Sequence, residues 1–384
     1  MSTENLPQSP ESQPSRKPRV AVVFGGRSSE HGISVVTAGA VLRAVDRDKY
    51  DVLPIGITRE GRWMLTADAP ERMAIEERRT PEVTDLAEGG DGGVVLPLDP
   101  ADREVVYSEP GSVPKALGEV DVVFPVLHGP YGEDGTLQGL LELSGVPYVG
   151  SGVLASAVGQ DKEYMKRVFA SFGLAVGPYL VIRPREWAQD ESGARKRIAG
   201  FAADHGWPLF VKPARAGSSI GITKVDDPAG LDEAITEAQR HDPKILVEAA
   251  VRGREIECGV LEFEDGPRAS VPAEIPAAHA YYDFESKYID SVPGIVPAPL
   301  TPEQTAEVRD LAVQAFDAAS CEGLVRADFF LTQDGEFVIN EINTMPGFTP
   351  ISMYPKMWEE TGVAYGELVD RLIQAALRRS TGLR

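Results

Sequence analysis

Four polar side chains near the C-terminal end of the chain have the types and spacing of a site for a cation or a phosphate. Asp328 and Glu341 supply carboxylates, Asn343 an amide and Arg326 a guanidinium. Burying unpaired charge is costly, so such a cluster usually meets a cation or an anionic ligand. Oxygen ligands of this kind suit Mg²⁺, which takes one or two carboxylates together with substrate phosphates. The alternative is a solvated salt-bridge cluster on a sheet edge.

A β-hairpin must position these side chains. Two apolar, strand-like runs flank Asp334-Gly335, and Asp-Gly between such runs predicts a hairpin turn. With this dipeptide as the turn, Asp328 lies opposite Glu341 and Arg326 lies opposite Asn343. Because side chains alternate along a strand, all four then point from the same face.

The same register predicts how far the four polar side chains are shielded from solvent. Phe330, Phe337 and Ile339 are expected to continue the polar face as apolar core, so that its polar end is at least half covered. This expectation favours a metal site over a solvated cluster.

Length and composition set the class of protein. A chain of 384 residues with 42% hydrophobic and 25% charged residues is long enough for two or three globular domains. No apolar run approaches the length of a membrane span. The net charge of −21 argues against nucleic acid or anionic membranes as partners, so an anionic ligand needs a locally basic pocket. The two cysteines, Cys258 and Cys321, lack metal-ligand spacing and fit a reduced, cytoplasmic setting.

The order of strands, glycine turns and helices predicts a mixed α/β and α+β protein. Residues 1–18, rich in Ser, Pro, Gln and Glu, are expected to form a disordered tail. Residues 19–150 alternate strands and helices, which predicts an α/β domain with a parallel sheet, carrying a polar insertion at about 60–118. A central α+β domain at 151–248 and a C-terminal domain at 249–384 follow. The predicted helices are 34–45, 137–144, 153–172, 231–239, 301–319 and 365–377.

Two glycine turns follow apolar strands of the first domain. The segment at 22–34 resembles a dinucleotide-binding fingerprint, but its glycines do not fit G-x-G-x-x-G, so a dehydrogenase is a weak interpretation. Glu30 in this turn has the charge to hold an ammonium group, or alternatively belongs to a helix capping box. His128 in the second turn lies at the carboxyl end of a strand, where open α/β sheets bind ligands, although a lone His there is more often structural.

Three further segments carry groups suited to a nucleotide. Lys212 precedes a Gly- and Ser-rich loop whose amides can cradle phosphate, although the loop is not a Walker A motif and a flexible turn is the alternative. Glu248 ends one strand and Glu255 begins the next, where carboxylates suit ribose hydroxyls or are plain surface charge. Lys287 and Tyr288 lie in an irregular segment that is either an active-site lid or a surface loop.

Taken in order, these segments resemble the D-alanine–D-alanine ligase family of the ATP-grasp superfamily. The resemblance spans Gly25 to Pro355. The motifs that carry it are GGRSSEHGIS, HGPYGEDG, QDK, KPARAGSSIG, VEAAVRGREIE, YDFESKY, RADFF and NEINTMPGFTPISMYP. It implies a three-domain fold that holds ATP between the central and C-terminal domains, a homodimer, and two Mg²⁺ (or Mn²⁺) ions.

The resemblance also implies roles for single residues. ATP is expected to contact Glu248, the backbone from Ala249 to Val251, Glu255 at the ribose, and Ser219 in the covering loop. The phosphate-binding lysines that it implies are Lys162, Lys212 and Lys287. The metal ligands are expected to be Asp328, Glu341 and Asn343. Met353 and Ala249 depart from the commoner Leu and Lys of the family, at positions that act through the backbone.

The substrates are expected to be two molecules of D-alanine. Glu30 would bind the ammonium group of the first, near His128, and Ser352 with the Met353 backbone would bind the carboxylate of the second. A second set of roles concerns closure and catalysis. Glu30, Ser218 and Tyr288 resemble the latch of the lid, and Arg326 with the Gly347 amide would stabilise the tetrahedral oxyanion.

Three rival interpretations remain. A relative that joins D-alanine to D-serine or D-lactate is the nearest, although Tyr288 argues against the D-lactate type, whose members lack a matching Tyr. A non-catalytic nucleotide-binding relative is the second, and the intact set of Arg326, Asp328, Glu341 and Asn343 argues against it. An oxidoreductase is the third.

Overall fold

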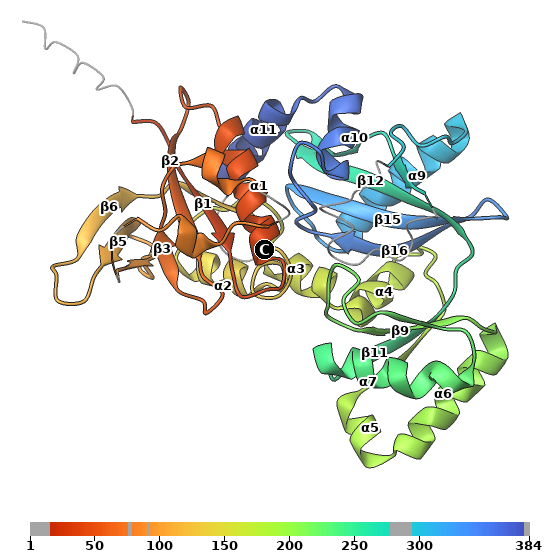
Figure 1. The fold of residues 1–384 in the computed structure, drawn as a ribbon. Helices are drawn as coiled ribbons and strands as arrows, with labels where there is room; N and C mark the ends of the chain where they lie inside the picture. The colour runs from red at the N-terminus through yellow and green to blue at the C-terminus, as the bar shows by residue number, and fades with distance from the viewer. Residues whose placement is uncertain (1–15, 76–78, 89, 91, 277–293, 380–384) are drawn as a thin grey trace, which may run out of the picture.

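The structure is a computed structural model. It describes residues 16–75, 79–88, 90, 92–276 and 294–379. These residues form four sheets with helices packed around them (Figure 1). None of the helices among these residues is both long and apolar enough to cross a membrane.

The N-terminal sheet has the parallel core that the sequence predicts. Its order is β3-β2-β1-β7, with β1 parallel to both β2 and β7, and β3 antiparallel at the edge. Its strands are β1 (Arg19–Gly25), β2 (Asp51–Ile57), β3 (Trp63–Leu65) and β7 (Val122–Pro125). The near-continuous apolar runs of β1 and β7 are buried, as expected for parallel strands covered on both faces. Helices α1 (His31–Ala44) and α2 (Thr136–Leu143) follow the two glycine turns.

The predicted insertion forms a small antiparallel sheet of its own. Its order is β4-β5-β6, and it lies at the outer edge of the N-terminal domain (Figure 1). Its strands are β4 (Gly93–Val95), β5 (Glu104–Ser108) and β6 (Lys115–Glu119), preceded by the 3₁₀ helices η1 (Pro70–Met73) and η2 (Val83–Asp85). Val105 of β5 packs in one cluster with Leu137 and Leu141 of α2, so the insertion is anchored to the first domain. Residues 16–18 of the predicted tail are described, and Arg16 binds Asp121.

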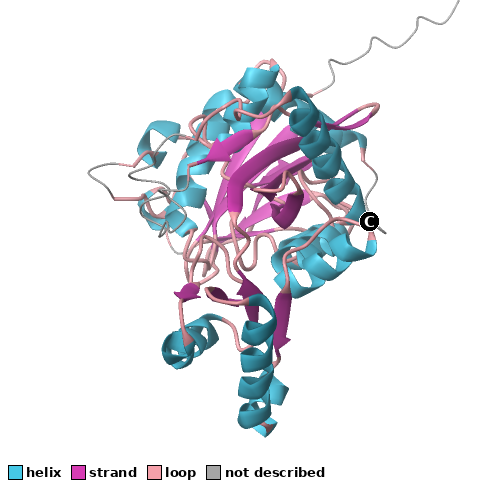
Figure 2. Cartoon of the chain, turned by 90° about the vertical axis from the view of Figure 1, so that its right-hand side faces the viewer, coloured by secondary structure: helices cyan, strands magenta, loops and turns pink. Residues whose placement is uncertain are grey.

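The central sheet is antiparallel, in the order β10-β9-β11-β8. Its strands are β8 (Tyr179–Ile182), β9 (Leu209–Pro213), β10 (Thr223–Val225) and β11 (Ile245–Ala249). Its helices are α5 (Pro184–Gln189), α6 (Glu191–His205), η3 (Pro228–Gly230) and α7 (Leu231–His241). The apolar faces of α6 and α7 pack with β9 and β11 in one cluster. Together these elements form the lobe that projects at the bottom of Figure 2.

The C-terminal sheet carries the hairpin. Its order is β13-β12-β15-β16, and β14 also pairs with β12. Its strands are β12 (Gly253–Phe263), β13 (Gly266–Ala269), β14 (Ala273–Ile275), β15 (Leu324–Thr332) and β16 (Phe337–Asn343). Helix α9 (Pro302–Ala318) packs on this sheet, and α10 (Met353–Thr361) and α11 (Tyr365–Arg378) follow it.

The helix predicted at 153–172 is two helices. They are α3 (Val153–Gln160) and α4 (Lys162–Ser171), separated at Asp161, whose backbone is extended. The Asp161 carboxylate accepts the N–H groups of Glu163 and Tyr164, so this residue ends one helix and caps the next. Ala155 of α3 and Met165 of α4 belong to the core of the C-terminal sheet, although the sequence analysis places 153–171 in the central domain.

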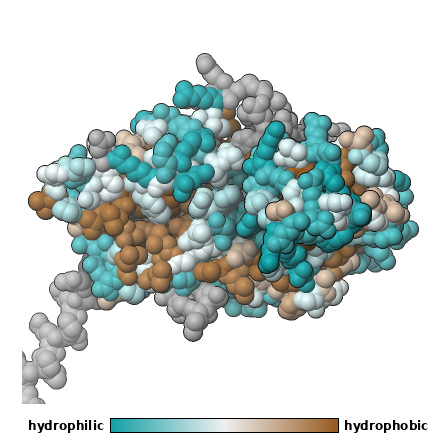
Figure 3. All heavy atoms as spheres, turned by 90° about the horizontal axis from the view of Figure 1, so that it is seen from below, coloured by the Kyte–Doolittle hydropathy of each residue, from teal (hydrophilic) through white to brown (hydrophobic). Residues whose placement is uncertain are grey.

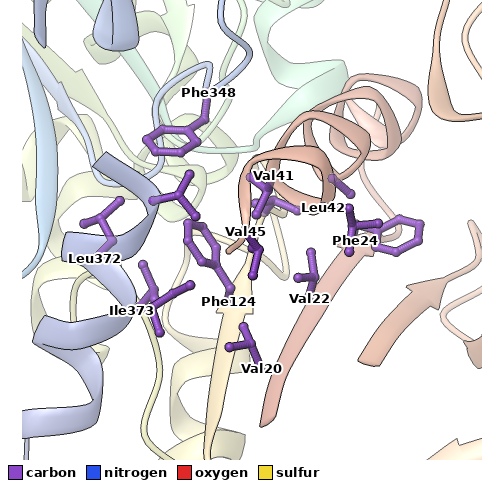
Figure 4. Close-up of a cluster of buried hydrophobic side chains, with 14 of the residues drawn as sticks. Val20, Val22, Phe24, Val41, Leu42, Val45, Phe124, Phe348, Leu372 and Ile373 are labelled. Carbon is purple, nitrogen blue, oxygen red and sulfur yellow. The ribbon is translucent and has the colours of Figure 1, made fainter. Parts of the chain in front are cut away.

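The C-terminal part of the chain packs against the N-terminal domain. Phe348, which follows the hairpin, lies in one buried cluster with Phe24 of β1, Phe124 of β7 and Ile373 of α11 (Figure 4). The rings of Phe124 and Phe348 are 6.1 Å apart. This packing holds the segment after β16 against the carboxyl ends of the parallel strands, and thereby fixes where the hairpin meets the glycine turns.

Candidate active site

The hairpin pairs the four polar residues as predicted. Arg326 lies opposite Asn343 and Asp328 lies opposite Glu341. The structure therefore confirms the register at the polar end.

The turn that produces this register is not the predicted one. The Thr332 N–H donates to the Glu336 carbonyl (2.9 Å) and Gly335 donates to the Thr332 carbonyl (3.1 Å), so three residues, not two, form the loop. Gly335 has φ +86°, a left-handed conformation that favours glycine. The longer loop shifts the register by one residue, and a bulge between the turn and the site restores it.

The bulge also changes which side chains share the polar face. On β16, Phe337 pairs with Leu331 and Ile339 with Phe329, and these four side chains are buried on the opposite face, in the core under α9. The prediction that Phe337 and Ile339 continue the polar face was therefore wrong. Phe330 alternates with Asp328 on β15 and remains beside it.

The polar face is a compact, mostly buried charge cluster. The Arg326 guanidinium donates from Nε and Nη2 to the two oxygens of Asp328, both at 2.7 Å, and Asn343 Nδ2 donates to the same carboxylate at 3.0 Å. Glu257, directly opposite Asp328 on β12, lies 3.4 Å from Arg326 Nε. Burial alone would lower the pKa of Arg326, but the Asp328 and Glu257 carboxylates outweigh it and raise that pKa well above its usual value. Glu257 was not predicted, although it lies two residues after Glu255 and therefore on the same face of the strand.

Basic residues approach this face from helix α4 and the central sheet. Lys162, the first residue of α4, lies 3.4 Å from Glu341 and donates to the Ala216 carbonyl at 2.9 Å. It therefore connects the predicted metal ligands with the Gly- and Ser-rich loop. Lys162 directly follows the break at Asp161.

A second group surrounds Glu248. Lys212 Nζ lies 2.7 Å from one Glu248 oxygen, and Lys166 Nζ lies 3.3 Å from the other. Burial alone would raise the pKa of Glu248, but the two lysines outweigh it and lower that pKa, while burial lowers the pKa of Lys166. Lys166 was not predicted, although its position one helical turn beyond Lys162 puts both lysines on the same helix face.

The expected adenine and ribose contacts lie around the same edge. Ala249 is the last residue of β11, and its N–H donates to the Pro178 carbonyl at 3.1 Å. Val251 follows in the connection to β12. Glu255 of β12 lies opposite Phe330, on the same strand face as Glu257. The structure thus brings Glu248, Ala249, Val251 and Glu255 together at the junction of the central and C-terminal sheets.

The expected ammonium site is built from two domains. Glu30 is buried, and its carboxylate accepts a hydrogen bond from Ser218 Oγ at 2.5 Å. Glu30 is the N-cap residue of α1, but its side chain makes no capping hydrogen bond, so the predicted capping bond from the Glu30 carboxylate was wrong. Ser28 Oγ does accept a backbone amide, that of Glu30, at 3.1 Å. Ser218 and Ser219 have φ of +49° and +59°, a conformation uncommon for residues other than glycine that concentrates at functional sites. Tyr288 and Lys287 lie outside the described residues.

His128 lies in the interior beside this group. Its Nδ1 is 3.1 Å from the Met345 carbonyl, which can only accept, so Nδ1 carries the proton and Nε2 is the acceptor. Nε2 is buried, and no described residue bonds to it. Burial lowers the pKa of His128, and the nearby Glu30 carboxylate only partly offsets this. A neutral imidazole with an open acceptor suits an N–H group of a substrate.

The expected carboxylate site lies at the start of α10. Ser352 is the N-cap and Met353 is the first helical residue, so free backbone N–H groups gather here. Ser352 Oγ accepts the Thr349 N–H at 3.2 Å. A Cβ on Gly347 would lie 3.2 Å from Ser352 Oγ, so a side chain at Gly347 would crowd this site.

The donor set fits Mg²⁺ shared with phosphate. Among the described residues, no group of three or more His, Cys, Asp and Glu side chains is arranged to hold a metal on its own. Two carboxylates facing each other across the hairpin, with an amide beside them, supply only part of an octahedral oxygen shell. Phosphate oxygens are the natural remainder, and Lys162 lies against Glu341 to meet them.

Comparisons with known proteins agree with this geometry. The model of the D-ala D-ala ligase N-terminus matches residues 19–151, and that of the C-terminus matches residues 168–374. Proteins named D-alanine–D-alanine ligase from Streptomyces avermitilis and Streptomyces coelicolor are 85% and 84% identical, each over 100% of both chains.

Solved structures agree as well. The VanG D-Ala:D-Ser ligase from Enterococcus faecalis is 35% identical, with a TM-score of 0.80 over 94% of this chain and 100% of that chain. The D-alanine-D-alanine ligase from Coxiella burnetii is also 35% identical, with a TM-score of 0.78 over 94% of each chain. The fold is therefore the ATP-grasp fold of these ligases, and the chain belongs to the D-ala D-ala ligase family.

Proposed function

We propose that this chain joins two molecules of D-alanine to D-alanyl-D-alanine with ATP, through an acyl phosphate, and so supplies a peptidoglycan precursor. The observation that carries the proposal is the meeting of three groups at one place. These groups are the Arg326–Asp328–Glu341–Asn343 face, the lysines of α4 and β9, and the Glu30–Ser218 pair. The relatives named D-alanine–D-alanine ligase support the choice of substrate.

The first step activates a carboxylate. An oxygen of the first D-alanine attacks the γ-phosphorus of ATP, and ADP leaves with the electron pair of the broken bond. Both reactants are anionic, so Lys162 and Lys212 lower their mutual repulsion. Glu30 holds the ammonium group of this substrate, and Ser218 fixes the Glu30 carboxylate at 2.5 Å. Lys287 and Tyr288 of the proposed lid would complete the phosphate and substrate contacts and exclude water.

Asp328, Glu341 and Asn343 are the residues that would hold Mg²⁺ or Mn²⁺. When bound, such ions neutralise charge on the transferred phosphoryl group. Lys162 lies 3.4 Å from Glu341 and so holds a positive charge beside these ligands.

The second step forms the peptide bond. The amine of the second D-alanine attacks the acyl carbon, a tetrahedral oxyanion forms, and phosphate leaves. Arg326 uses Nε and Nη2 for Asp328, and no described residue hydrogen-bonds to its Nη1. In the proposed step this remaining donor and the Gly347 N–H bind the oxyanion, while Ser352 and the Met353 backbone hold the carboxylate of the second substrate. Each donor to the oxyanion is worth about 3 kcal/mol.

An assay of phosphate release tests the proposal. Release from ATP is expected to require D-alanine and to fall strongly in Glu341→Gln, because the hairpin then loses one of its two metal carboxylates. Equal turnover with L-alanine, or with D-lactate as second substrate at neutral pH, would contradict the proposal.

The 35% identity to a D-Ala:D-Ser ligase favours one second candidate, in which D-serine is the second substrate. The same assay compares D-serine with D-alanine. A higher kcat/KM for D-serine would replace D-alanine as the second substrate without changing the chemistry.

We also propose that the protein is a cytoplasmic homodimer. Both cysteines are free and buried, which fits a reducing compartment. Apolar surface gathers on the underside of the N-terminal half (Figure 3), where α2 and α3 lie (Figure 1). Leu143 and Leu154 of these helices are 70% and 54% exposed. Sedimentation is expected to show a dimer that Leu143→Lys with Leu154→Lys converts to a monomer, whereas a monomeric parent protein would contradict the proposal.

A further inference from the structure

A carboxylate of the second glycine turn joins two segments of the site. Glu133 lies in the loop between β7 and α2, in the HGPYGEDG motif. Its Oε2 accepts the Gly129 N–H at 2.8 Å, and its Oε1 accepts the Met345 N–H at 3.0 Å. Gly129 belongs to the loop that carries His128, whereas Met345 follows the hairpin. One carboxylate therefore holds backbone from the N-terminal domain and from the C-terminal domain together.

His128 binds the carbonyl oxygen of Met345, the second polar backbone group of that residue. Its Nδ1 donates to the Met345 carbonyl at 3.1 Å. Both backbone hydrogen-bonding groups of Met345 are thus satisfied by side chains of one loop of another domain. Met345 itself stands between Asn343, a proposed metal ligand, and Gly347, the proposed oxyanion donor.

The chain around Met345 has little regular structure to fix it. Strand β16 ends at Asn343 and α10 begins at Met353, so no strand or helix ladder places the backbone between them. Pro346, the next residue, has no N–H to donate. A backbone group of Met345 without a partner would be costly in this buried region, so the partners it has decide its position.

We propose that Glu133 is a positioning residue for peptide-bond formation, which acts by holding Met345 so that the Gly347 N–H points at the oxyanion that forms on the acyl carbon. The proposal rests on the proposed function. Glu133 acts through Met345 and does not itself contact the amine or the acyl carbon. A shift at Met345 is passed through Pro346 to Gly347, and misplacement of a catalytic group by about 1 Å can cost 10²-fold in rate.

The type of side chain supports this role. The two oxygens of a carboxyl group can each accept one N–H, whereas the amide of Gln would turn a donor toward one of the two N–H groups. Burial raises the pKa of Glu133 to about 8, although the two N–H bonds oppose this.

Glu133→Gln tests the proposal, with Asp134→Asn as the matched control. Asp134 is the neighbouring acid, and its carboxylate accepts hydrogen bonds from Tyr131 of the same loop and from Thr136, the first residue of α2. The measurement is the number of ADP molecules released per dipeptide formed, together with kcat and the KM for ATP. Loss of stability alone would not change this ratio.

In Glu133→Gln we expect the rate of dipeptide formation to fall about tenfold or more, with the KM for ATP within about twofold of the parent value. We expect the ADP-to-dipeptide ratio to rise above one, because an acyl phosphate that waits for a misplaced oxyanion donor is lost to water. Asp134→Asn is expected to keep the ratio of the parent protein. A parental rate and ratio in Glu133→Gln, or an equal change in Asp134→Asn, would overturn the proposal.

Hydrogen exchange separates this proposal from the proposed function. If the parent protein makes no dipeptide from D-alanine and ATP, the proposed function fails. The contact of Glu133 with Met345 is then judged by hydrogen exchange in peptides covering 344–352. Faster exchange in Glu133→Gln than in Asp134→Asn supports it, and equal exchange refutes it.

Discussion

Removing the Arg326 guanidinium would leave buried carboxylates facing each other without their cation. In the folded chain Arg326 forms two 2.7 Å bonds with Asp328 and lies 3.4 Å from Glu257. The side chains of Asp328 and Glu257 are only 5% and 8% exposed, so water replaces little of the lost interaction. Arg326→Met keeps much of the side-chain volume and removes the charge.

The size of the effect follows from this burial. Removing one partner of a buried ion pair costs about 3–5 kcal/mol, because the other charge stays buried and unpaired. At 1.36 kcal/mol per factor of ten, local opening of the sheet becomes roughly 10²- to 10⁴-fold more frequent. The matched control is Arg254→Met. Arg254 also donates two hydrogen bonds to a carboxylate, that of Glu274, at 2.9 and 2.7 Å. Its side chain is 38% exposed, so Arg254→Met is expected to cost only about 0–1 kcal/mol.

Hydrogen exchange of peptides from β12 and β15 measures this opening. The double variant Arg326→Met with Asp328→Asn removes an uncompensated carboxylate as well and is expected to recover most of the lost protection. Exchange in Arg326→Met that matches Arg254→Met would refute the reasoning. A double variant as unprotected as the single one would show that lost packing, not charge, is responsible.

Three further predictions concern other buried titratable groups. Lys244 donates to Asp161 at 2.7 and 2.5 Å with both groups buried, so Lys244→Met is expected to destabilise the fold by about 3–5 kcal/mol in urea unfolding; an effect below about 1 kcal/mol would contradict it. Lys166→Met leaves Glu248 with Lys212 as its cation. The KM for ATP is expected to rise about 5- to 30-fold, which corresponds to a loss of about 1–2 kcal/mol of binding free energy. An unchanged KM would argue against a role of Lys166 in ATP binding. The pKa of His128 is lowered in the fold, so its contribution to stability is complete above pH 6.5 and is lost as the pH falls below it. The difference in unfolding free energy between the parent protein and His128→Gln should therefore change by up to about 1.4 kcal/mol per pH unit below 6.5, and a constant difference would refute this.

The candidate site was largely predictable from the chain because its residues follow local rules. Arg326 and Asp328 are two residues apart on one strand, and so are Glu341 and Asn343 on its partner. Any hairpin of the right register therefore places these four polar groups on one face. The glycine turns placed Glu30 and His128 at strand ends for the same reason. The resemblance to a family then supplied the roles that residue types alone left open.

The hairpin also shows where local reasoning ends. The Asp-Gly signal predicted a two-residue turn, and the fold has a three-residue loop whose shift a bulge on β16 cancels before the site. The site register came out as predicted, whereas Phe337 and Ile339 moved to the other face. Packing against α9 decides which face is apolar, and no local signal contains that contact.

The sequence by itself determined which side chains are candidates for the chemistry, because residue type and strand or turn spacing are local properties. Only the tertiary structure decided their partners: Glu257 beside Arg326, Lys166 beside Glu248, and Glu133 on Met345. The physical reason is that a buried charge or backbone group must find a partner wherever the fold brings one. Such partners come from distant segments, so the packing of the domains selects them.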